Sequence, residues 1–362
     1  MKYVDEFRDP QLAGGLLERI AQRSTRAVRL MEFCGGHTHA ILQHGLRQLL
    51  PPTVTLRSGP GCPVCVTSAH DLDVAIALAG VPGAILATFG DMVRVPGSRE
   101  SLHDARARGA DVRVVYSPLD ALTLAEAHPG RPVIFLAVGF ETTAPTVAAT
   151  LLRAEERGVG NLYVQSLHKL TLPAVRAILA DGEVRLDGVI GPGHVATVTG
   201  SRAWRLLPDE YRVPCAIAGF EPVDLLAAIL ALVEMAEDGR PDLANTYGRS
   251  VRPEGNPRAQ EVMLRAFHEV DAEWRGLGTL PGSGLGLREA LAHRDAARVF
   301  RVDVPPPAPP RGCRCGDIVR GALEPGDCPL FRVACTPARP AGPCMVSAEG
   351  ACAAYFRYGG DE

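Results

Sequence analysis

The sequence predicts an α/β fold with two lobes, each built on a parallel sheet, followed by a helical and cysteine-rich C-terminal domain. Three observations favour it. Short β-branched runs alternate with amphipathic stretches through the first 240 residues, strand candidates such as VIFLAVGF are almost continuously apolar, and six of the ten cysteines fall between Cys313 and Cys352. Because 362 residues exceed what one hydrophobic core usually supports, we expect three parts, at 1–120, 121–240 and 241–362.

Strands and helices are expected to alternate along the first two parts. The expected strands cover 53–59, 84–90, 111–117, 132–140, 162–167, 187–193 and 214–220. The expected helices cover 68–80, 99–109, 144–158 and 172–182, several of which end at a glycine. In the third part, a long amphipathic helix over 256–278 precedes a glycine-rich turn, a shorter helix ending near Phe300 and an extended proline-rich linker over 303–312.

Composition excludes several classes of function. A formal net charge of −3 provides no basic field for nucleic acid. No apolar run of roughly 18 residues occurs, so we expect no membrane span, and the N-terminus MKYVDEFRDPQ lacks the apolar core of a signal peptide. We therefore expect a cytoplasmic protein. In that reducing compartment, ten cysteines favour metal binding or thiol chemistry over structural disulfides.

Glycine-rich turns follow most of the expected strands: GPGCPVC, FGDMVRVPGS, GFETTAP, GPGHVATVTG and GFEPVD. Open α/β sheets bind ligands beyond the carboxyl ends of their strands, so these turns predict a cleft, although no dinucleotide-binding G-x-G-x-x-G occurs at them. The repeated Gly-Phe-Glu at 139–141 and 219–221 is typical of two similar lobes. Side chains that fit either the cleft or a cap or turn are Asp91, Arg94, Glu141, Thr142, His168, His194 and Glu221, whereas Cys215 is expected as a buried strand residue.

The C-terminal cysteines predict a sulfur-ligand site. They are separated by 1, 12, 6, 8 and 7 residues, and C-x-C is a poor zinc knuckle. Wide, uneven spacing suits an iron–sulfur cluster, on which four thiolates converge from separate loops. Zinc remains the alternative, and with six cysteines for four positions the spacing does not choose the ligands.

Eight motifs in order along nearly the whole chain resemble the HypD family of hydrogenase maturation factors: EFCGGHTHAI, GPGCPVCVT, FGDMVRVPGS, GFETTAPT, SLHKL, GPGHVATVTG, GFEPVDLL and the tail CPLF…CTP…GPCMVSAEGACAAY. The resemblance implies assembly of the Fe(CN)2CO unit of [NiFe]-hydrogenases by two α/β domains and a domain with a [4Fe-4S] cluster. The cluster ligands of the family map onto Cys315, Cys328, Cys335 and Cys352, with Cys344 as the competing candidate and Cys313 as a spare.

The stretch CGGHTH, residues 34–39, has a chemical interpretation on this basis. The resemblance implies that Cys34 carries the transient iron with its CN and CO ligands, for which a thiolate is a suitable donor. Gly35, Gly36 and Thr38 would line the cyanide ligands with hydrogen-bond donors. His37 and His39 would donate to the ligands, shuttle protons or lower the pKa of the Cys34 thiol. A solvated helix N-terminus explains at least one histidine equally well.

The motif CPVC, with Cys62 and Cys65 between a strand and a helix, predicts a redox dithiol rather than half of a zinc site. A dithiol delivers the two electrons that release one cyanide from a protein-bound thiocyanate, and a cluster delivers one electron at a time. The resemblance implies HypC as the protein that shares the iron, HypE as the cyanide donor, and the hydrogenase large subunit as a partner reached through HypC. Two alternatives stay open: an iron–sulfur-dependent thiol–disulfide reductase acting on other proteins, and a zinc-stapled binding module.

Overall fold

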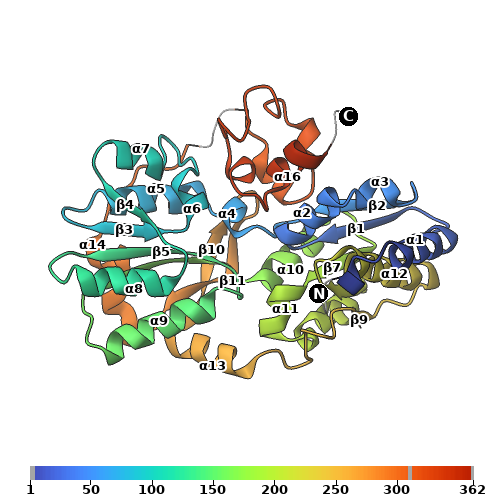
Figure 1. Ribbon diagram of the computed structural model, residues 1–362, viewed down its shortest axis with the longest axis horizontal. Coiled ribbons are helices and arrows are strands. Elements are labelled where there is room, and N and C mark those ends of the chain that lie inside the picture. The colour runs from blue at the N-terminus through green and yellow to red at the C-terminus, as the bar shows by residue number, and fades with distance from the viewer. Residues whose placement is uncertain (1–4, 309–311, 360–362) are drawn as a thin grey trace.

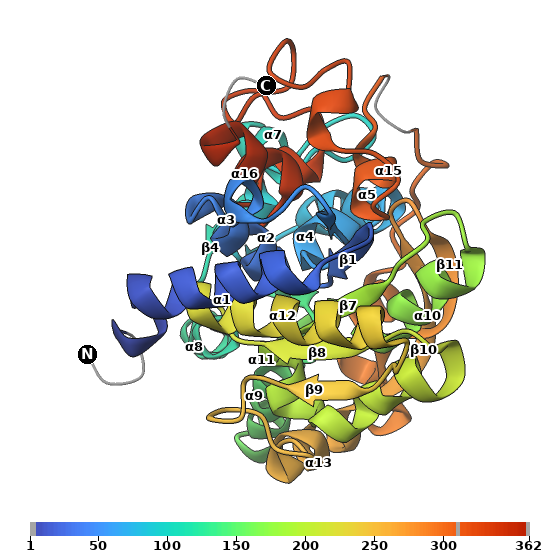
Figure 2. The ribbon, with the colours of Figure 1, turned by 90° about the vertical axis from the view of Figure 1, so that its right-hand side faces the viewer.

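The computed structural model describes residues 5–308 and 312–359. Two parallel sheets lie side by side along the long axis of the molecule, and the C-terminal segment sits over their junction (Figure 1). Seen at right angles, the same segment again lies at one end, above α2 and α4 (Figure 2). The prediction of an α/β protein with parallel sheets and a separate cysteine-rich region is confirmed.

The first sheet has five parallel strands in the order β2-β1-β7-β8-β9. These strands are β1 (Val28–Glu32), β2 (Val54–Ser58), β7 (Gly188–Pro192), β8 (Cys215–Ala218) and β9 (Leu243–Asn245). One face packs against α1 (Pro10–Arg23), α2 (Gly35–Gln43), α3 (Leu46–Leu49) and α12 (Pro222–Asp238), whose leucines and isoleucines build a fully buried core. The other face carries α10 (Thr171–Asp181) and α11 (Gly193–Thr199).

The second sheet has four parallel strands in the order β4-β3-β5-β6. These are β3 (Ile85–Thr88), β4 (Asp111–Val114), β5 (Val133–Gly139) and β6 (Leu162–His168). All seven residues of β5 are buried, as expected of a central strand that helices cover on both faces. One face packs against α8 (Pro118–Ala127) and α9 (Ala144–Glu156), and the other against α5 (Ala69–Ala79) and α7 (Leu102–Ala107).

The sheets do not divide where the sequence was expected to divide, at residue 120. Strands β1 and β2 from the first predicted part share a sheet with β7 and β8 from the second, while β3 to β6 form the other sheet. The chain leaves the first sheet after β2, builds the second, and returns at β7. The alternation of strands and helices in the sequence shows which segments are strands but not which strands pair. Strand pairing depends on contacts between distant segments, so the return of the chain to the first sheet at β7 could not be predicted from the alternation.

The expected helix over 256–278 is wrong in its second half. Helix α13 (Pro257–Ala266) is followed by an antiparallel hairpin of β10 (Phe267–Trp274) and β11 (Gly278–Leu287). Phe267 and Trp274 are both buried and lie seven residues apart, a spacing that a helix and a bulged strand can share. The expected shorter helix is α14 (Ala296–Phe300), and the predicted linker over 303–312 lies partly outside the described residues.

The C-terminal segment folds around its cysteines with little regular structure. Helix α15 (Cys315–Val319) and 3-10 turns at Pro325–Asp327 and Pro343–Met345 precede α16 (Ala351–Tyr358), which packs on α2. Glu324 fastens the segment to the first sheet, because its carboxylate lies 3.2 Å from Arg47 and 3.0 Å from Arg57. Within residues 5–308 and 312–359, no helix combines the length and the apolar character that crossing a bilayer requires.

Candidate functional site

The carboxyl ends of both sheets open into one cleft of about 460 Å³. Its walls follow β1, β2, β3, β5 and β7, which is where an α/β sheet offers ligand positions. The C-terminal segment closes one side with Glu349. The residues at its surface are Phe33, Cys34, Gly61, Pro63, Val64, Phe89 to Met92, Val138 to Phe140, Thr142, Thr143, Pro192, His194, Val195 and Glu349.

Cys34 lies in this cleft as the N-cap residue of α2. Burial of the sulfur, together with the nearby charge of Glu349, raises the pKa of Cys34 to about 12, although the backbone N–H groups of Gly36 and His37 bond the sulfur and favour its thiolate. The expected lowering of this pKa by a neighbouring histidine is therefore not found. A metal-free Cys34 is a protonated thiol, and a soft metal ion would replace its proton.

The two histidines of the CGGHTH stretch lie in different surroundings. His37 is fully buried, and its Nε2 lies 3.2 Å from the carbonyl oxygen of Ala218. Burial lowers the pKa of His37 to about 4, so the ring is neutral at pH 7. Phe220 lies between the rings of His37 and His194, at centroid distances of 4.6 and 4.0 Å. Of these two histidines, His194 lines the cleft.

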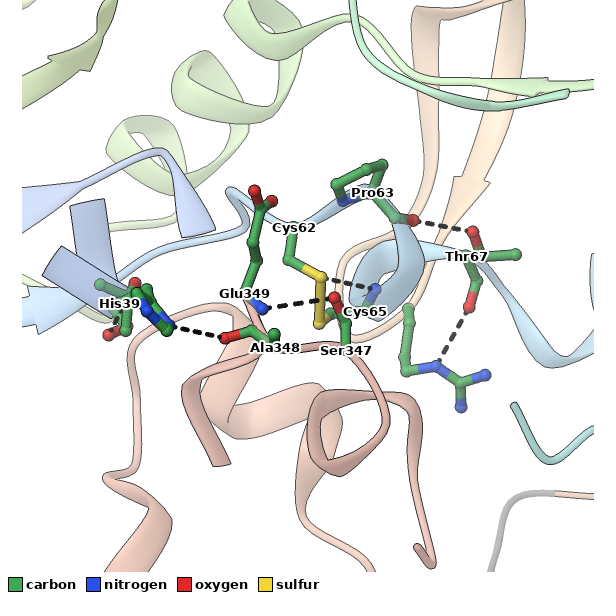
Figure 3. Close-up of a disulfide and its surroundings, with 11 residues drawn as sticks. His39, Cys62, Pro63, Cys65, Thr67, Ser347, Ala348 and Glu349 are labelled. Atoms are coloured by element: carbon green, nitrogen blue, oxygen red, sulfur yellow. Dashed lines mark hydrogen bonds between the residues drawn. A yellow bond between two sulfur atoms is a disulfide. The ribbon is translucent and has the colours of Figure 1, made fainter. Parts of the chain in front are cut away.

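His39 points to the C-terminal segment. Its Nδ1 lies 3.2 Å from the carbonyl oxygen of Ala348 (Figure 3). Its ring also makes a T-shaped contact with the ring of Tyr358. This histidine therefore joins α2 to the C-terminal segment, rather than standing free at a solvated helix end.

Thr38 leads to a residue that sequence analysis missed. Its hydroxyl donates to Glu32 at 2.6 Å, and the N–H of Gly59 donates to the other Glu32 oxygen at 3.1 Å. Glu32 is only 4% exposed, and this burial raises its pKa to about 8. The carboxyl thus ties β1, α2 and the turn before Cys62 together. The available signal was a carboxylate directly before the motif FCGGHTH, at the end of the mostly apolar stretch VRLM.

Cys62 and Cys65 form a disulfide around the short helix α4 (Pro63–Val66). Their exposed fractions are 4% and 2%, and the Cys65 N–H donates to Cys62 Sγ at 3.2 Å. The bridge lies against the loop that carries Ser347 and Glu349 (Figure 3). Both cysteines of the bridge line a small cavity together with Gly35 and Cys344. The disulfide therefore adjoins both the helix that follows Cys34 and the C-terminal cysteines.

All six C-terminal cysteines line one narrow cavity, whose other walls are apolar and include Ile318, Leu330, Phe331 and Met345. Within this cavity Cys344 hydrogen-bonds with both Cys315 and Cys352, and the N–H of Ala341 donates to Cys335 Sγ at 3.2 Å. Among the described residues, no three His, Cys, Asp or Glu side chains are grouped as a site for a single metal ion. Convergent thiols, apolar walls and a backbone donor to sulfur fit an iron–sulfur cluster, whose ligands stand farther apart. The structure brings all six together and does not reduce them to four.

The remaining predicted cleft residues divide into two groups. Asp91, Thr142 and His194 line the cleft. The others serve the fold. Arg94 donates to the carbonyl of Pro337, and Glu141 accepts from the N–H and the hydroxyl of Thr171. His168 is buried and hydrogen-bonds with Ser166, and Glu221 forms an ion pair with Arg8 at the start of α12. Cys215 is buried in β8, as expected.

Comparisons with known proteins identify the family. The HypD family model, described as "Hydrogenase formation hypA family", matches residues 11–359. The chain is 51% identical to the hydrogenase maturation factor HypD of Azotobacter vinelandii, over 99% of this chain and 97% of the relative. It is 47% identical to HypD of Rhizobium leguminosarum bv. viciae, over 99% and 96%, and 43% identical to HypD of Escherichia coli K12, over 99% and 98%. The chain belongs to the HypD family of hydrogenase maturation factors.

Proposed function

We propose that this chain is a cytoplasmic scaffold on which the Fe(CN)2CO unit of a [NiFe]-hydrogenase is assembled. The observation that carries the proposal is the succession of three sulfur centres. Cys34 lies in the cleft, the Cys62–Cys65 disulfide lies beneath it, and the six C-terminal cysteines lie beyond the disulfide. One small cavity, lined by Gly35, Cys62, Cys65 and Cys344, adjoins all three sulfur centres.

Iron is the cargo of this scaffold, and Cys34 is its ligand on this chain. The N–H groups of Gly36 and His37 already bond the sulfur, so they would stabilise the thiolate that iron requires. The cleft of about 460 Å³ leaves room for diatomic ligands and for a cysteine of the small chaperone HypC, with which the iron would be shared. Through HypC, the finished unit would pass to the hydrogenase large subunit.

Cyanide transfer from HypE needs a reductant. A thiocyanate on the HypE sulfur takes up two electrons, its S–C bond breaks, and thiolate and cyanide are released. Oxidation of the Cys62–Cys65 dithiol to the observed disulfide supplies those two electrons and releases two protons. A [4Fe-4S] cluster on Cys315, Cys328, Cys335 and Cys352, with Cys344 in competition, would supply single electrons. Cys344 lines the cavity that contains the disulfide, which favours an electron path on this side.

The rival functions fit the geometry less well. A general thiol–disulfide reductase must present a sulfur to many proteins that have no dedicated docking surface, and here both sulfurs are almost fully buried. It also leaves Cys34 and its cleft without a role. A zinc-stapled module would use Cys62 and Cys65 as metal ligands, whereas the structure pairs them with each other.

Infrared spectroscopy with iron and sulfide analysis tests the proposal, on protein purified without oxygen together with HypC. We expect cyanide and CO stretching bands that disappear in Cys34→Ala and persist in Cys215→Ala, which removes a buried thiol from β8. A cluster without these bands would favour the reductase. Zinc without sulfide would refute both.

A further inference from the structure

A tight turn in the C-terminal segment closes one side of the cavity that the six cysteines line. The N–H groups of Val333, Ala334 and Cys335 all donate to the carbonyl oxygen of Leu330, at 3.2, 3.1 and 2.7 Å. Leu330 and Phe331 line the cavity. Val333 and Ala334 are exposed, Val333 by 83%. At this place a single turn of the chain therefore separates the cysteine cavity from solvent.

The turn belongs to a longer surface loop, residues 329–340, which we call the cavity loop. Its exposed residues are mostly apolar: Pro329, Val333, Ala334, Pro337 and Ala338. One exposed apolar side chain on a protein surface needs no explanation, whereas a group of them is typical of a contact surface. The cavity loop thus offers a partner protein a small apolar patch next to the cysteines.

The cavity loop is positively charged, on a chain whose formal net charge is −3. Arg332 and Arg339 are its only charged residues. The exposed Arg94 adds a third cation, because its Nη1 donates to the carbonyl oxygen of Pro337 at 3.3 Å. Among the described residues, no Asp or Glu forms an ion pair with Arg94 or Arg339. Both charges are therefore available to an acidic partner.

An apolar patch among cations, placed over a redox centre, suits one kind of contact. Proteins that exchange electrons meet through small, short-lived interfaces, and opposite charges steer the encounter. Electron tunnelling weakens exponentially with distance, so the partner must dock where little protein covers the cluster. The cavity loop meets both conditions.

We propose that the cavity loop and Arg94 form the docking surface for a small acidic protein that carries a one-electron redox group and reduces the C-terminal cluster. This inference rests on the proposed function, because it requires the [4Fe-4S] cluster. In each encounter the carrier loses one electron and the oxidised cluster gains it. Two encounters supply the two electrons that, with two protons, reopen the Cys62–Cys65 disulfide as a dithiol.

An acidic plant-type [2Fe–2S] ferredoxin serves as the probe, on protein purified without oxygen. The variants are Arg339→Glu, Val333→Ser and the matched control Arg240→Glu. Arg240 is exposed, follows α12 and, within the part of the chain that the structure describes, forms no ion pair. Both charge reversals lower the net charge by two, so only the position of the change differs.

Two readouts separate docking from electron transfer. Calorimetry measures the dissociation constant of oxidised ferredoxin, and stopped-flow spectroscopy measures the rate at which reduced ferredoxin, or dithionite, reduces the cluster. We expect Arg339→Glu to weaken binding and slow reduction by ferredoxin about tenfold at low salt, and to match the parent at roughly 1 M salt, where charges are screened. Val333→Ser should weaken binding about threefold at both salt concentrations, because it removes apolar contact. Arg240→Glu should stay near the parent, and dithionite should reduce all four proteins equally fast.

Several results would overturn this docking surface. Unchanged binding in Arg339→Glu, or an equal loss in Arg240→Glu, refutes it, and unchanged binding in Val333→Ser refutes the apolar contact. Should Arg339→Glu lose iron and sulfide, the neutral Arg339→Gln takes its place, with an expected loss of about threefold.

Other occupants of the cavity loop give different results. Weaker binding of HypC or HypE to Arg339→Glu assigns the loop to an assembly partner, and parent dimers that Arg339→Glu abolishes in sedimentation assign it to a second copy. Either result refutes the proposal. So does a parent cluster that dithionite reduces and ferredoxin does not. A parent that contains no iron and sulfide refutes the proposed function itself, whatever its affinity for ferredoxin.

Discussion

Gly61 lies directly against the backbone of Cys34. Its carbonyl oxygen accepts from the N–H of Gly35 at 2.9 Å, and a Cβ placed on Gly61 would overlap the backbone nitrogen of Cys34. The turn that carries the disulfide and the turn that carries the cleft thiol are thus in backbone contact. Only a residue without a side chain allows this approach.

Substitution of Gly61 by Ala should separate the two turns. Because the added Cβ meets backbone rather than a flexible side chain, we expect a loss of about 1–3 kcal/mol in the free energy of unfolding, measured in urea. The infrared bands of the iron unit should weaken with it. Gly130→Ala is the control, since a Cβ there has nothing within 4 Å. Equal stability of both variants would contradict the contact.

The buried carboxyl of Glu32 should make stability depend on pH. Its pKa rises from an ordinary 4.5 to about 8 on folding, so between these values the folded state binds more protons than the unfolded state. Stability is therefore full below about pH 4.5 and declines as pH rises through 8, by on the order of 5 kcal/mol.

Glu32→Gln should remove this decline. The Thr38 hydroxyl, which donates to Glu32 in the structure, can instead turn its proton to Ser58, 3.4 Å away. The amide of the variant can then donate to Thr38 and accept from Gly59, as a protonated acid would, so the variant should gain stability relative to the parent as pH rises. Urea unfolding at pH 5 and pH 8 measures the difference, and Glu269→Gln, at an exposed position, provides the control. Parallel pH curves for Glu32→Gln and the parent would show that Glu32 is charged when folded.

Serine substitutions should distinguish the cluster ligands from the spare cysteines. Iron and sulfide should be lost from the variants of Cys315, Cys328, Cys335 and Cys352, and retained in Cys313→Ser. Since Cys344 hydrogen-bonds with both Cys315 and Cys352, its variant decides the remaining position. If Cys344→Ser loses iron while the variant of one of the four expected ligands keeps it, Cys344 is a cluster ligand and that other cysteine is not.

The buried disulfide should be accessible to small reductants and closed to proteins that do not dock over the cleft. Cys62 and Cys65 are 4% and 2% exposed, so the reduced protein should reduce insulin no faster than its Cys65→Ser variant. Dithiothreitol should still open the bridge, which mass spectrometry after alkylation in urea would detect. Insulin reduction that depends on Cys65 would instead favour the reductase.

Cyanide transfer should in turn depend on Cys65. With HypE loaded as thiocyanate, Cys65→Ser should abolish the cyanide bands, because a single thiol cannot form the disulfide that releases two electrons. Cys215→Ala serves again as the control. Bands that survive in Cys65→Ser would contradict the dithiol as reductant.

Local sequence patterns predicted well the strands that helices cover on both faces, because all side chains of such a strand are buried and its consecutive residues are therefore apolar. Strand β5 is the example, since its predicted span of 132–140 encloses the observed Val133–Gly139. Strand β1 was not predicted, because Arg29 and Glu32 interrupt its apolar run. Glu32 is nevertheless buried, and its hydrogen bonds come from α2 and from the turn after β2.

The parts of the site that were missed come from contacts between distant segments. Motif spacing placed Cys62 and Cys65 between a strand and a helix, where the structure has them, whereas Cys34 follows β1, which was not predicted. It gave no sign that Glu349, more than 300 positions away, closes the same cleft, or that the tip of the β10–β11 hairpin reaches Thr67 and Gly316. Such contacts depend on how the two sheets, the hairpin and the C-terminal segment pack against each other. A short stretch of sequence carries no information about this packing.

The interleaved order of the sheets has a consequence for synthesis on the ribosome. Residues 85–168 can complete the second sheet while the first still lacks β7, β8 and β9, which end only at residue 245. Cys34 and Cys62 are thus translated early and enclosed late, after β7 is added and the last segment is released. A nascent or truncated chain has no cleft, so the iron binding proposed for Cys34 would be restricted to finished molecules.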